Sequence, residues 1–483
     1  MMLTQEQLEI LSNVKQMCAN EILKINAFAG TGKTSTLMAI TKALPHKQFL
    51  YLAFNRSIVQ ECKMKFPANV TILTTHSLAF RKIALPYYIQ QGHEIHDGNY
   101  KPAQIANLYG VENLLAYEAL CVLEEFFTSD TRELSSKTSD AHTLAYTIYR
   151  DMIEHRRDIT HSFYLKQYQL LQDKEHPKYD YILLDEGQDT NDVTLDIFLN
   201  FDAAKIIVGD THQAIYGWRG ARNAMDKIQA DANHYLSTTF RCSQHIVDRA
   251  NFVLKNYKSE DVKIISSCNL EPKDESYAVI TRTNAKIIEN IAEYEDEYRL
   301  VKCPQSIFET AITLHFWLNR AFEKITNPSF EYLKTFKNKT HLDQYIEETN
   351  SIELKSSLLI AQRYKKSIFA IYKKAKNAYR GNLDQSKKSR KQKDSQIFLL
   401  SGHTSKGLEF DIVELENDFP ALEEIYQKES KSAQELIEEA NLYYVALTRA
   451  KFKLTDNSKN HDLFDSQNGM TNDIQIVKGN VKK

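Results

Sequence analysis

The sequence predicts an α/β protein with two parallel-sheet domains, each interrupted by a mainly helical insertion. Short apolar runs that indicate buried strands alternate with helix-forming stretches, and this alternation is typical of parallel sheets. A glycine-rich loop separates the first of these strands from the first helix, as a phosphate-binding domain requires. Two long stretches, residues 80–177 and 303–394, are mainly helical.

Length and composition describe an ordinary globular chain. The 483 residues are enough for two to four domains, and 42% hydrophobic and 26% charged residues are typical values. The formal net charge of −2 gives no overall attraction to nucleic acid, so a polyanion site must be a local basic groove. The six scattered cysteines argue against a zinc site or a disulfide framework. We expect a cytosolic protein without a membrane contact, because neither a signal peptide nor an apolar run of roughly 18 residues is present.

A phosphate-binding loop is predicted at residues 27–34, between an apolar run and a helix-forming stretch. Gly30 and Gly32 let the backbone turn its N–H groups toward phosphates at the positive end of the helix. Lys33 would reach the β- and γ-phosphates, and the Thr34 hydroxyl would help to hold Mg²⁺.

The N-terminal helix expected at residues 4–18 carries an ambiguous glutamine. Gln7 suits a capping box with Thr4, and this pattern alone favours the cap; the alternative is an amide whose paired donor and acceptor read the edge of adenine.

Polar and aromatic side chains follow the next two expected strands. Phe54 and Asn55 end one apolar run, and Thr75 and His76 follow the run at residues 70–73. Parallel α/β folds bind ligands at the carboxyl ends of their strands, so these side chains are candidates for a binding surface. For His76, a purely structural role is an equal alternative.

Two acidic residues end the apolar strand expected at residues 181–184. Asp185 can hold Mg²⁺ through water, and Glu186 can orient and deprotonate an attacking water. An exposed acidic turn is the alternative, and the preceding apolar strand disfavours it.

A polar loop follows the strand expected at residues 204–208. Gln213 in this loop could sense a γ-phosphate. Tyr216 and Trp218, beside Arg219, suit stacking on the bases of single-stranded nucleic acid, at about 1–3 kcal/mol per base. The alternative is that both rings belong to the core.

A strand at residues 236–241 is expected to open the second α/β unit. The loop at residues 402–410 carries His403 and Glu409 and is a candidate ligand loop. A helix is expected at residues 432–451. Arg449, near its end, is either a surface charge or an arginine that reaches a γ-phosphate across a cleft.

The second insertion becomes basic toward its end. About a dozen Lys and Arg lie between Lys355 and Lys393, and Lys387–Lys393 is the densest run. Such a run is either a solvated loop or a contact for nucleic-acid phosphates, and the pattern leaves both interpretations open.

In this order, the motifs resemble the superfamily-one DNA helicases of the UvrD/Rep/PcrA type, and within that group the helicase core of the F-box DNA helicases. We expect no F-box, because the first matching stretch begins at Leu3. The matching stretches are Leu3–Gln7, Ala27–Thr34, Phe54–Asn55, Thr75–Ala79, Asp185–Asp189, Val208–Ala221, Phe240–Arg241, Thr281–Asn284, His403–Phe410 and Asn441–Lys451.

The resemblance implies two RecA-like domains with ATP between them and single-stranded DNA across their top. The implied divisions are a first RecA-like domain at 1–79 and 178–230, a helical insertion at 80–177, a second RecA-like domain at 231–302 and 395–456, a basic helical insertion at 303–394, and a tail at 457–483.

The resemblance also implies residue roles. The nucleotide site would comprise Gln7, Ala29, Gly30, Thr31, Gly32, Lys33, Thr34, Ser35, Phe240 and Glu409, with Mg²⁺ on Thr34 and Asp185. Catalysis would use Glu186, Gln213, Arg241 and Arg449. The DNA path would be lined by Phe54, Asn55, Thr75, His76, Tyr216, Trp218, Arg219 and His403.

Departures from the family pattern bear on function. Ala27 replaces the first loop glycine, and Ser35 and Thr36 stand where many bacterial relatives place an arginine that contacts the nucleotide. The second insertion is shorter than in the large bacterial enzymes, which puts processive unwinding in doubt.

The implied activity is an ATP- and Mg²⁺-dependent helicase or translocase that moves 3′→5′ on single-stranded DNA, in DNA repair, recombination or replication. Two alternatives stay open. One is a translocase that strips proteins such as recombinase filaments with little unwinding. The other is an ATP-switch subunit of a nuclease-coupled repair or defence complex. The expected partners are single-stranded DNA and single-strand/double-strand junctions, with a nuclease or recombinase as protein partner under these alternatives.

Overall fold

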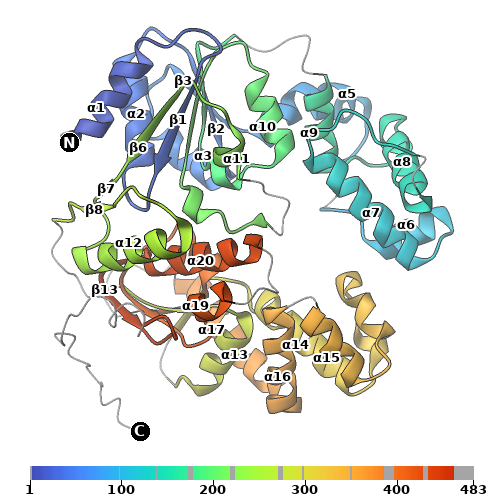
Figure 1. The fold of residues 1–483 in the computed structure, drawn as a ribbon. Helices are drawn as coiled ribbons and strands as arrows, with labels where there is room; N and C mark the ends of the chain where they lie inside the picture. The colour runs from blue at the N-terminus through green and yellow to red at the C-terminus, as the bar shows by residue number, and fades with distance from the viewer. Residues whose placement is uncertain are drawn as a thin grey trace. The chain divides into compact units, whose positions relative to one another are not determined.

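The computed structural model describes residues 3–96, 98–136, 139–171, 178–217, 223–269, 276–295, 298–348, 351–385, 396–427 and 433–461. The chain divides into two compact units (Figure 1). The first unit comprises Met1–Arg241, Val262–Asn269 and Phe316–Leu342, and the second comprises the remaining segments, Cys242–Asp261, Leu270–His315 and Asp343–Lys483. Among the described helices, none combines the length and the apolar character needed to cross a membrane.

A six-stranded parallel sheet forms the centre of the first unit. Its order is β3-β2-β4-β5-β1-β6. The strands are β1 (Ile22–Ala27), β2 (Phe49–Ala53), β3 (Val70–Thr74), β4 (Tyr181–Leu184), β5 (Ala204–Gly209) and β6 (Ala232–Leu236). Every residue of β2, β4 and β5 is buried, which explains why these strands, apart from Lys205 of β5, are apolar along their length rather than alternating.

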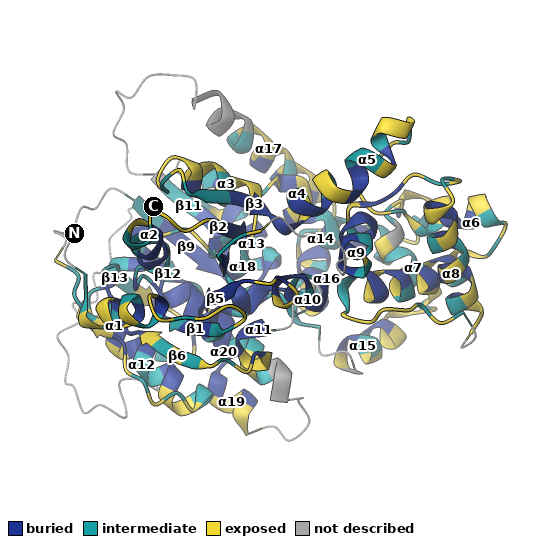
Figure 2. Cartoon of the chain, turned by 90° about the horizontal axis from the view of Figure 1, so that it is seen from above, coloured by how far each residue is buried: buried dark blue, intermediate teal, exposed yellow. Residues whose placement is uncertain are grey.

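Helices cover both faces of this sheet, so its strands lie inside the unit (Figure 2). On one face, Ile10, Leu37 and Ile40 pack with strand residues such as Ile25 and Val208. The flanking helices of the sheet are α1 (Gln5–Val14), α2 (Lys33–Ala43), α3 (Arg56–Lys63), α10 (Asp192–Leu199) and α11 (Ala224–Lys227), with the short helical turns η3 (Gly187–Asp189) and η4 (Thr211–Gln213).

The first insertion is helical, as predicted, in the part of residues 80–177 that the structure describes. It leaves the sheet after β3 and returns at β4, and its core is continuous with the other face of the sheet. It follows α4 (Thr75–Ala79), and its elements are η1 (Phe80–Ala84), α5 (Leu85–Tyr87), η2 (Ile89–Gln91), α6 (Pro102–Tyr109), α7 (Asn113–Thr128), α8 (Asp140–Ile153) and α9 (His161–Leu170). Side-chain oxygens of Thr74, Ser139 and Thr160 cap α4, α8 and α9, which fixes where these helices begin.

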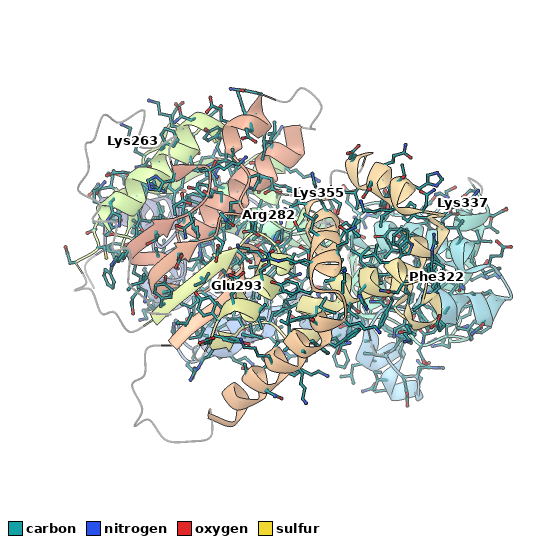
Figure 3. The ribbon with its side chains drawn as sticks, turned by 90° about the horizontal axis from the view of Figure 1, so that it is seen from below. Lys263, Arg282, Glu293, Phe322, Lys337 and Lys355 are labelled. Carbon is teal, nitrogen blue, oxygen red and sulfur yellow. The ribbon has the colours of Figure 1, made fainter. Side chains whose placement is uncertain are left out.

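The second unit contains a five-stranded parallel sheet of order β10-β11-β9-β12-β13. Its strands are β9 (Ser276–Thr281), β10 (Tyr298–Leu300), β11 (Gln396–Ser401), β12 (Phe410–Leu415) and β13 (Ala450–Asp456). Its helices outside the insertion are α12 (Gln244–Lys258), α13 (Asn284–Glu293), α18 (Gly402–Ser405), α19 (Leu422–Tyr426) and α20 (Ala433–Leu447). Arg282, labelled in Figure 3, follows β9 and donates to Glu439 of α20 at 2.8 Å, which ties the strand end to that helix.

The second insertion lies between β10 and β11 and is also helical in its described residues. Its elements are α14 (Pro304–Leu318), η6 (Phe322–Lys324), η7 (Pro328–Thr335), α15 (Lys339–Glu348), α16 (Ile352–Tyr364), η8 (Lys365–Ser367) and α17 (Ile368–Gln385). The basic run Lys387–Lys393 lies outside the described residues.

Two expected elements differ from the structure. Residues 236–241 were expected to open the second α/β unit, but β6 pairs with β1 and completes the first sheet. The next residues form β7 (Thr238–Thr239), which pairs with β8 (Ile265–Ser266) in a small separate sheet of the first unit. The helix expected at residues 432–451 ends at Leu447, and β13 begins at Ala450. The finer domain boundaries of the sequence analysis, and the RecA-like assignment, stay predictions.

Candidate nucleotide and nucleic-acid sites

The phosphate-binding loop lies between β1 and α2, where the sequence pattern predicts it. Gly30 and Gly32 have φ values of +73° and +84°, which side-chain-bearing residues rarely adopt. A Cβ on Gly30 would lie 2.5 Å from the Cβ of Arg241 and 2.7 Å from Oγ1 of Thr239, so only glycine fits there. Gly32 is the N-cap of α2 and no side chain caps it, which leaves the first N–H groups of this helix able to bind an anion.

Lys33 forms an ion pair with Glu186. Its Nζ lies 2.9 Å from both carboxylate oxygens, and the two side chains are only 16% and 23% exposed. Burial alone would lower the pKa of Lys33, but Glu186, Asp185 and Asp210 outweigh that effect and raise the pKa. The ammonium therefore stays charged, and a bound phosphate would compete with Glu186 for it.

The two predicted acidic residues lie at the end of β4. Asp185 is 5% exposed, and its Oδ1 accepts from the backbone N of Glu186 at 2.9 Å. Desolvation, with the neighbouring Glu186 charge, raises the pKa of Asp185 to about 6. Glu186 has a left-handed backbone with φ of +53°, a conformation that costs a non-glycine residue roughly 1–3 kcal/mol. Such a cost is typical of functional sites.

The end of β5 joins these acids through two glutamines. Gln213 donates to Asp210 at 2.6 Å, and Gln188 accepts from the backbone N of Asp210 at 3.0 Å. Gln188 also donates to Glu186. Gln213 was predicted as a site residue, whereas Gln188 and Asp210 were missed. The sequence marked both residues only by their position in the polar segments that follow two buried strands, β4 and β5.

Gln7 forms the predicted capping box. Thr4 N donates to Oε1 of Gln7 at 3.0 Å, and the N of Gln7 donates to Thr4 Oγ1 at 3.2 Å. The amide nitrogen of Gln7 donates to Thr36 of α2 at 2.9 Å, and Thr36 in turn donates to the carbonyl of Gly32. The cap is confirmed and lies beside the phosphate loop. Adenine recognition by Gln7 stays a prediction.

The segment after β7 lies against the phosphate loop within the first unit. Phe240 N donates to the carbonyl of Gly30 at 3.0 Å, and Thr239 Oγ1 donates to the carbonyl of Ala29 at 2.7 Å. Arg241 follows at once, so two predicted site residues lie beside the loop. Thr239 was missed by the sequence analysis.

Several predicted DNA-path residues line one cavity of about 180 Å³ in the first unit. The rings of Phe54 and Tyr216 are almost parallel, at 12°, with centroids 6.4 Å apart, and Phe54 is 47% exposed. Other residues that line this cavity include Thr75, His76, Asp185, Asp189, Thr190 and Asn191.

Within this group, His76 packs edge-on against Tyr164, with ring centroids 6.2 Å apart. Partial desolvation lowers the pKa of His76, and the nearby charges of His161 and Arg56 lower it further, so its ring is neutral at physiological pH. Asn55 caps α3 by accepting from Ile58 N at 3.0 Å, which gives it a structural role as well. Trp218 and Arg219 lie outside the described residues.

Three predicted residues belong to the second unit. Arg449 lies in the turn between α20 and β13 rather than in a helix, because α20 ends at Leu447. The side chain is 1% exposed, and it donates to the carbonyls of Val445 and Leu408 at 2.8 and 3.2 Å. Its interpretation as a surface charge is therefore wrong. Glu409 is paired with Lys451 at 3.0 Å.

His403, the third of these residues, lies on the short helix α18 and is half-buried.

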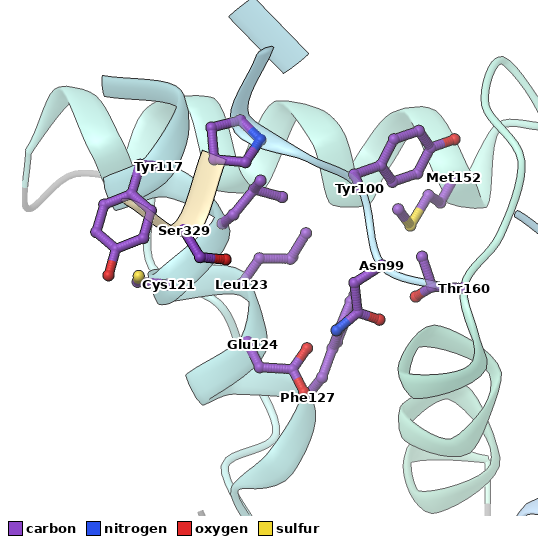
Figure 4. Close-up of a pocket in the computed structure, with 12 residues that line it drawn as sticks. Asn99, Tyr100, Tyr117, Cys121, Leu123, Glu124, Phe127, Met152, Thr160 and Ser329 are labelled. Carbon is purple, nitrogen blue, oxygen red and sulfur yellow. The ribbon is translucent and has the colours of Figure 1, made fainter. Parts of the chain in front are cut away.

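A second cavity, of about 200 Å³, lies in the first unit and contains none of the predicted site residues (Figure 4). It is mostly apolar. Tyr100, Tyr117, Leu123, Phe127 and Met152 contribute to its lining. No role follows from these residues.

The oxygen donors of the site suit Mg²⁺. The part of the chain that the structure describes holds no group of three or more His, Cys, Asp or Glu that could bind a metal ion. Mg²⁺ with a nucleotide needs no such group, because phosphates and waters supply most of its ligands. The Thr34 hydroxyl and the buried Asp185 carboxylate are hard oxygen donors of the kind that this ion prefers.

A phosphate-binding loop at the carboxyl end of a parallel strand, with its lysine paired to a carboxylate that follows β4 of the same sheet, defines a phosphate-loop α/β protein. Comparison with known families places the chain more closely. The UvrD/REP helicase N-terminal domain matches residues 88–234, and the UvrD-like helicase C-terminal domain matches residues 320–456. The chain belongs to the UvrD-like helicase family, as the motifs predicted.

Individual relatives agree with this assignment. "F-box DNA helicase protein 1" of Schizosaccharomyces pombe is 30% identical over 97% of this chain and 59% of its own length. "F-box DNA helicase 1" of Gallus gallus is 26% identical over 93% of this chain and 48% of its own length. "ATP-dependent DNA helicase PcrA" of Staphylococcus aureus is 33% identical over 23% of this chain and 17% of its own length. The chain thus spans about half to three-fifths of the two F-box relatives.

Proposed function

We propose that this chain is an ATP-dependent DNA helicase or translocase that moves 3′→5′ on single-stranded DNA, in repair, recombination or replication. The observation that carries the proposal is the Lys33–Glu186 pair at the phosphate loop, with a ring-lined cavity at the adjacent strand ends of the same sheet. The Lys33–Glu186 pair supplies the phosphate-binding and base groups that ATP hydrolysis requires, and the cavity presents rings on which bases could stack.

In the ATP reaction, the loop N–H groups and Lys33 would bind the β- and γ-phosphates. Mg²⁺, when bound by Thr34 and Asp185, would neutralise charge that develops on the phosphates. Lys33 would exchange its carboxylate partner for phosphate, which frees Glu186 to orient the attacking water and accept its proton. Gln213, hydrogen-bonded to Asp210, would report the γ-phosphate to the end of β5.

The other residues predicted to contact the nucleotide complete this scheme. Gln7 would read adenine and Phe240 would stack on it, since both lie beside the phosphate loop. Arg241 and Arg449 would stabilise the γ-phosphate during transfer, and Glu409 would contact the ribose. For Arg449 this requires release from the carbonyls that it contacts in the structure.

Single-stranded DNA would run past the rings of Phe54 and Tyr216. The two rings are nearly parallel, with centroids 6.4 Å apart, and Phe54 is 47% exposed, so its ring could stack on a base. Thr75, His76 and Asn55 from the same strand ends, with Trp218, Arg219 and His403, would complete the path.

Direction of movement gives a direct test. A biotin–streptavidin block is placed at either the 3′ or the 5′ end of a single strand, and ATP-dependent displacement is measured. We expect rapid displacement from the 5′ end only, and none by Glu186→Gln. Equal displacement from both ends, or displacement from the 3′ end alone, would contradict the proposed polarity. A parallel assay with a duplex junction separates unwinding from protein stripping.

A further inference from the structure

A buried tyrosine contacts the carboxylate at the centre of the nucleotide site. Tyr51 lies on β2, is 0% exposed, and its hydroxyl donates to Oδ2 of Asp185 at the end of neighbouring β4. The other oxygen of Asp185 accepts from the backbone N of Glu186. The carboxylate is therefore oriented by one donor on each oxygen.

The surroundings of Tyr51 hold its hydroxyl in place. Phe66 packs edge-on against its ring at 5.2 Å, and the buried Cys62 of α3 belongs to the same hydrophobic cluster as Tyr51. Both β2 and β4 are buried along their whole length. A phenol in such a position has little freedom to turn away from Asp185.

We propose that Tyr51 is a positioning residue that presents Asp185 to the Mg²⁺ of a bound nucleotide. The inference rests on the proposed function, because it assumes that Asp185 meets the metal. Outer partners of this kind orient a ligand for its metal, and their loss typically costs 10- to 100-fold in metal affinity. No pattern in the sequence marked Tyr51, since it lies in the middle of an apolar strand.

The test measures how much Mg²⁺ strengthens nucleotide binding. The Kd of a fluorescent ADP is determined in EDTA and in saturating Mg²⁺, and the ratio of the two values is compared between variants. Tyr51→Phe is expected to reduce this ratio about 10-fold and to leave the Kd in EDTA unchanged. A general disturbance of the site would instead weaken both values together.

Tyr181→Phe is the matched control. Tyr181 lies on β4 of the same sheet, is 5% exposed, and its hydroxyl donates to a backbone carbonyl, that of Val14, at 3.0 Å. Tyr181→Phe removes a buried hydroxyl that does not contact Asp185. The ratio of its two Kd values should therefore equal that of the unmodified protein. In an Asp185→Asn background, Tyr51→Phe should change the ratio less than about 2-fold, because the two act as a pair.

The outcomes separate the two proposals. A normal ratio in Tyr51→Phe, or an equal loss with and without Mg²⁺, would overturn the positioning role and leave the proposed function standing. Tyr51→Phe could also lower the melting temperature well below that of Tyr181→Phe. In that case the double variant decides: if Tyr51→Phe still reduces the Kd ratio when Asp185 is already Asn, the positioning role is overturned. Failure of the unmodified protein to bind nucleotide would refute the proposed function and, with it, this inference.

Discussion

At the residue scale, the Lys33–Glu186 ion pair joins two side chains that act in the proposed reaction. The same lysine that would bind phosphate is held 2.9 Å from the carboxylate that would activate water. Each side chain is thus kept in the site by the other. In the proposed reaction a phosphate would replace Glu186 as the partner of Lys33, and separating the pair would reduce the net free energy of nucleotide binding.

This competition makes a prediction for Glu186→Gln. The neutral amide pairs less strongly with Lys33, so ATP should bind several-fold more tightly than to the unmodified protein. Hydrolysis should fall by about 10²–10⁴-fold, because the general base is lost. Equilibrium binding and single-turnover hydrolysis measure the two effects separately. Weaker ATP binding by this variant would contradict the competition.

The buried Lys166 of the first insertion is expected to make the stability of the protein depend on pH. It is 0% exposed, donates to the carbonyl of Ser129 at 2.9 Å, and lies 4.4 Å above the ring of Phe126. Desolvation lowers its pKa to about 8 from an ordinary value of 10.5. Between these two values the folded protein releases a proton that the unfolded chain keeps, so Lys166 makes stability rise with pH in that window.

The effect is measured by chemical denaturation against Lys166→Met. From pH 7.5 to 9.5, the free energy of unfolding of the unmodified protein should rise by about 2 kcal/mol relative to the variant. Other groups that titrate in this range, such as tyrosines, cancel in the comparison. A constant difference across this range would show that the lysine is solvated in the folded state.

At the element scale, the strand–loop–helix around the phosphate loop and the acidic end of β4 could be predicted because their signals are local. Pairing between distant strands leaves no such signal, and β6 was therefore assigned to the wrong sheet. The strand β13 did have a local signal. Residues 450–456 alternate between apolar and polar types, but the preceding helical pattern concealed it.

Contacts between side chains that are distant in the sequence could not be predicted either. Tyr51 and Thr239 became site residues only through contacts with residues far away in the sequence, the carboxylate of Asp185 and the carbonyl of Ala29. The predicted Phe54 and Tyr216 did come together, because both follow strands whose carboxyl ends meet at one edge of the sheet.

The end of the second insertion carries a basic stripe, defined as the exposed Lys366, Lys373 and Lys376 of η8 and α17. Ile368, Ile371 and Ala375 form the buried side of the same helix. No Asp or Glu occurs between residues 354 and 383, which contain seven Lys or Arg besides the preceding Lys355, labelled in Figure 3. A solvated surface would normally mix both signs.

Charge reversal decides between the two interpretations of this region. Changing the basic stripe to glutamate should weaken DNA binding by 10-fold or more and flatten its salt dependence, if the stripe contacts phosphates. The control changes Lys255, Lys453 and Lys459 to glutamate, which gives the same charge in the same unit. Equal affinity of both variants, measured by fluorescence anisotropy against salt, would favour a merely solvated surface.

At the scale of the whole molecule, both units contain a parallel sheet, but they carry different predicted site residues. The first unit holds the phosphate loop, both acids and the ring-lined cavity. The second unit contributes Arg449, Glu409 and His403. In the proposed motor, hydrolysis in the first unit would depend on groups carried by the second. The central claim is therefore that ATP turnover depends on DNA held at Phe54 and Tyr216.

The most direct test of this claim is the rate of ATP hydrolysis as single-stranded DNA is added. We expect strong stimulation in the unmodified protein and none in Glu186→Gln. Phe54→Ala should need about 10-fold more DNA for half-maximal stimulation, because one stacking contact is lost, and Tyr87→Ala, which removes another exposed ring, should behave normally. Absence of stimulation while DNA is bound would contradict a self-sufficient motor.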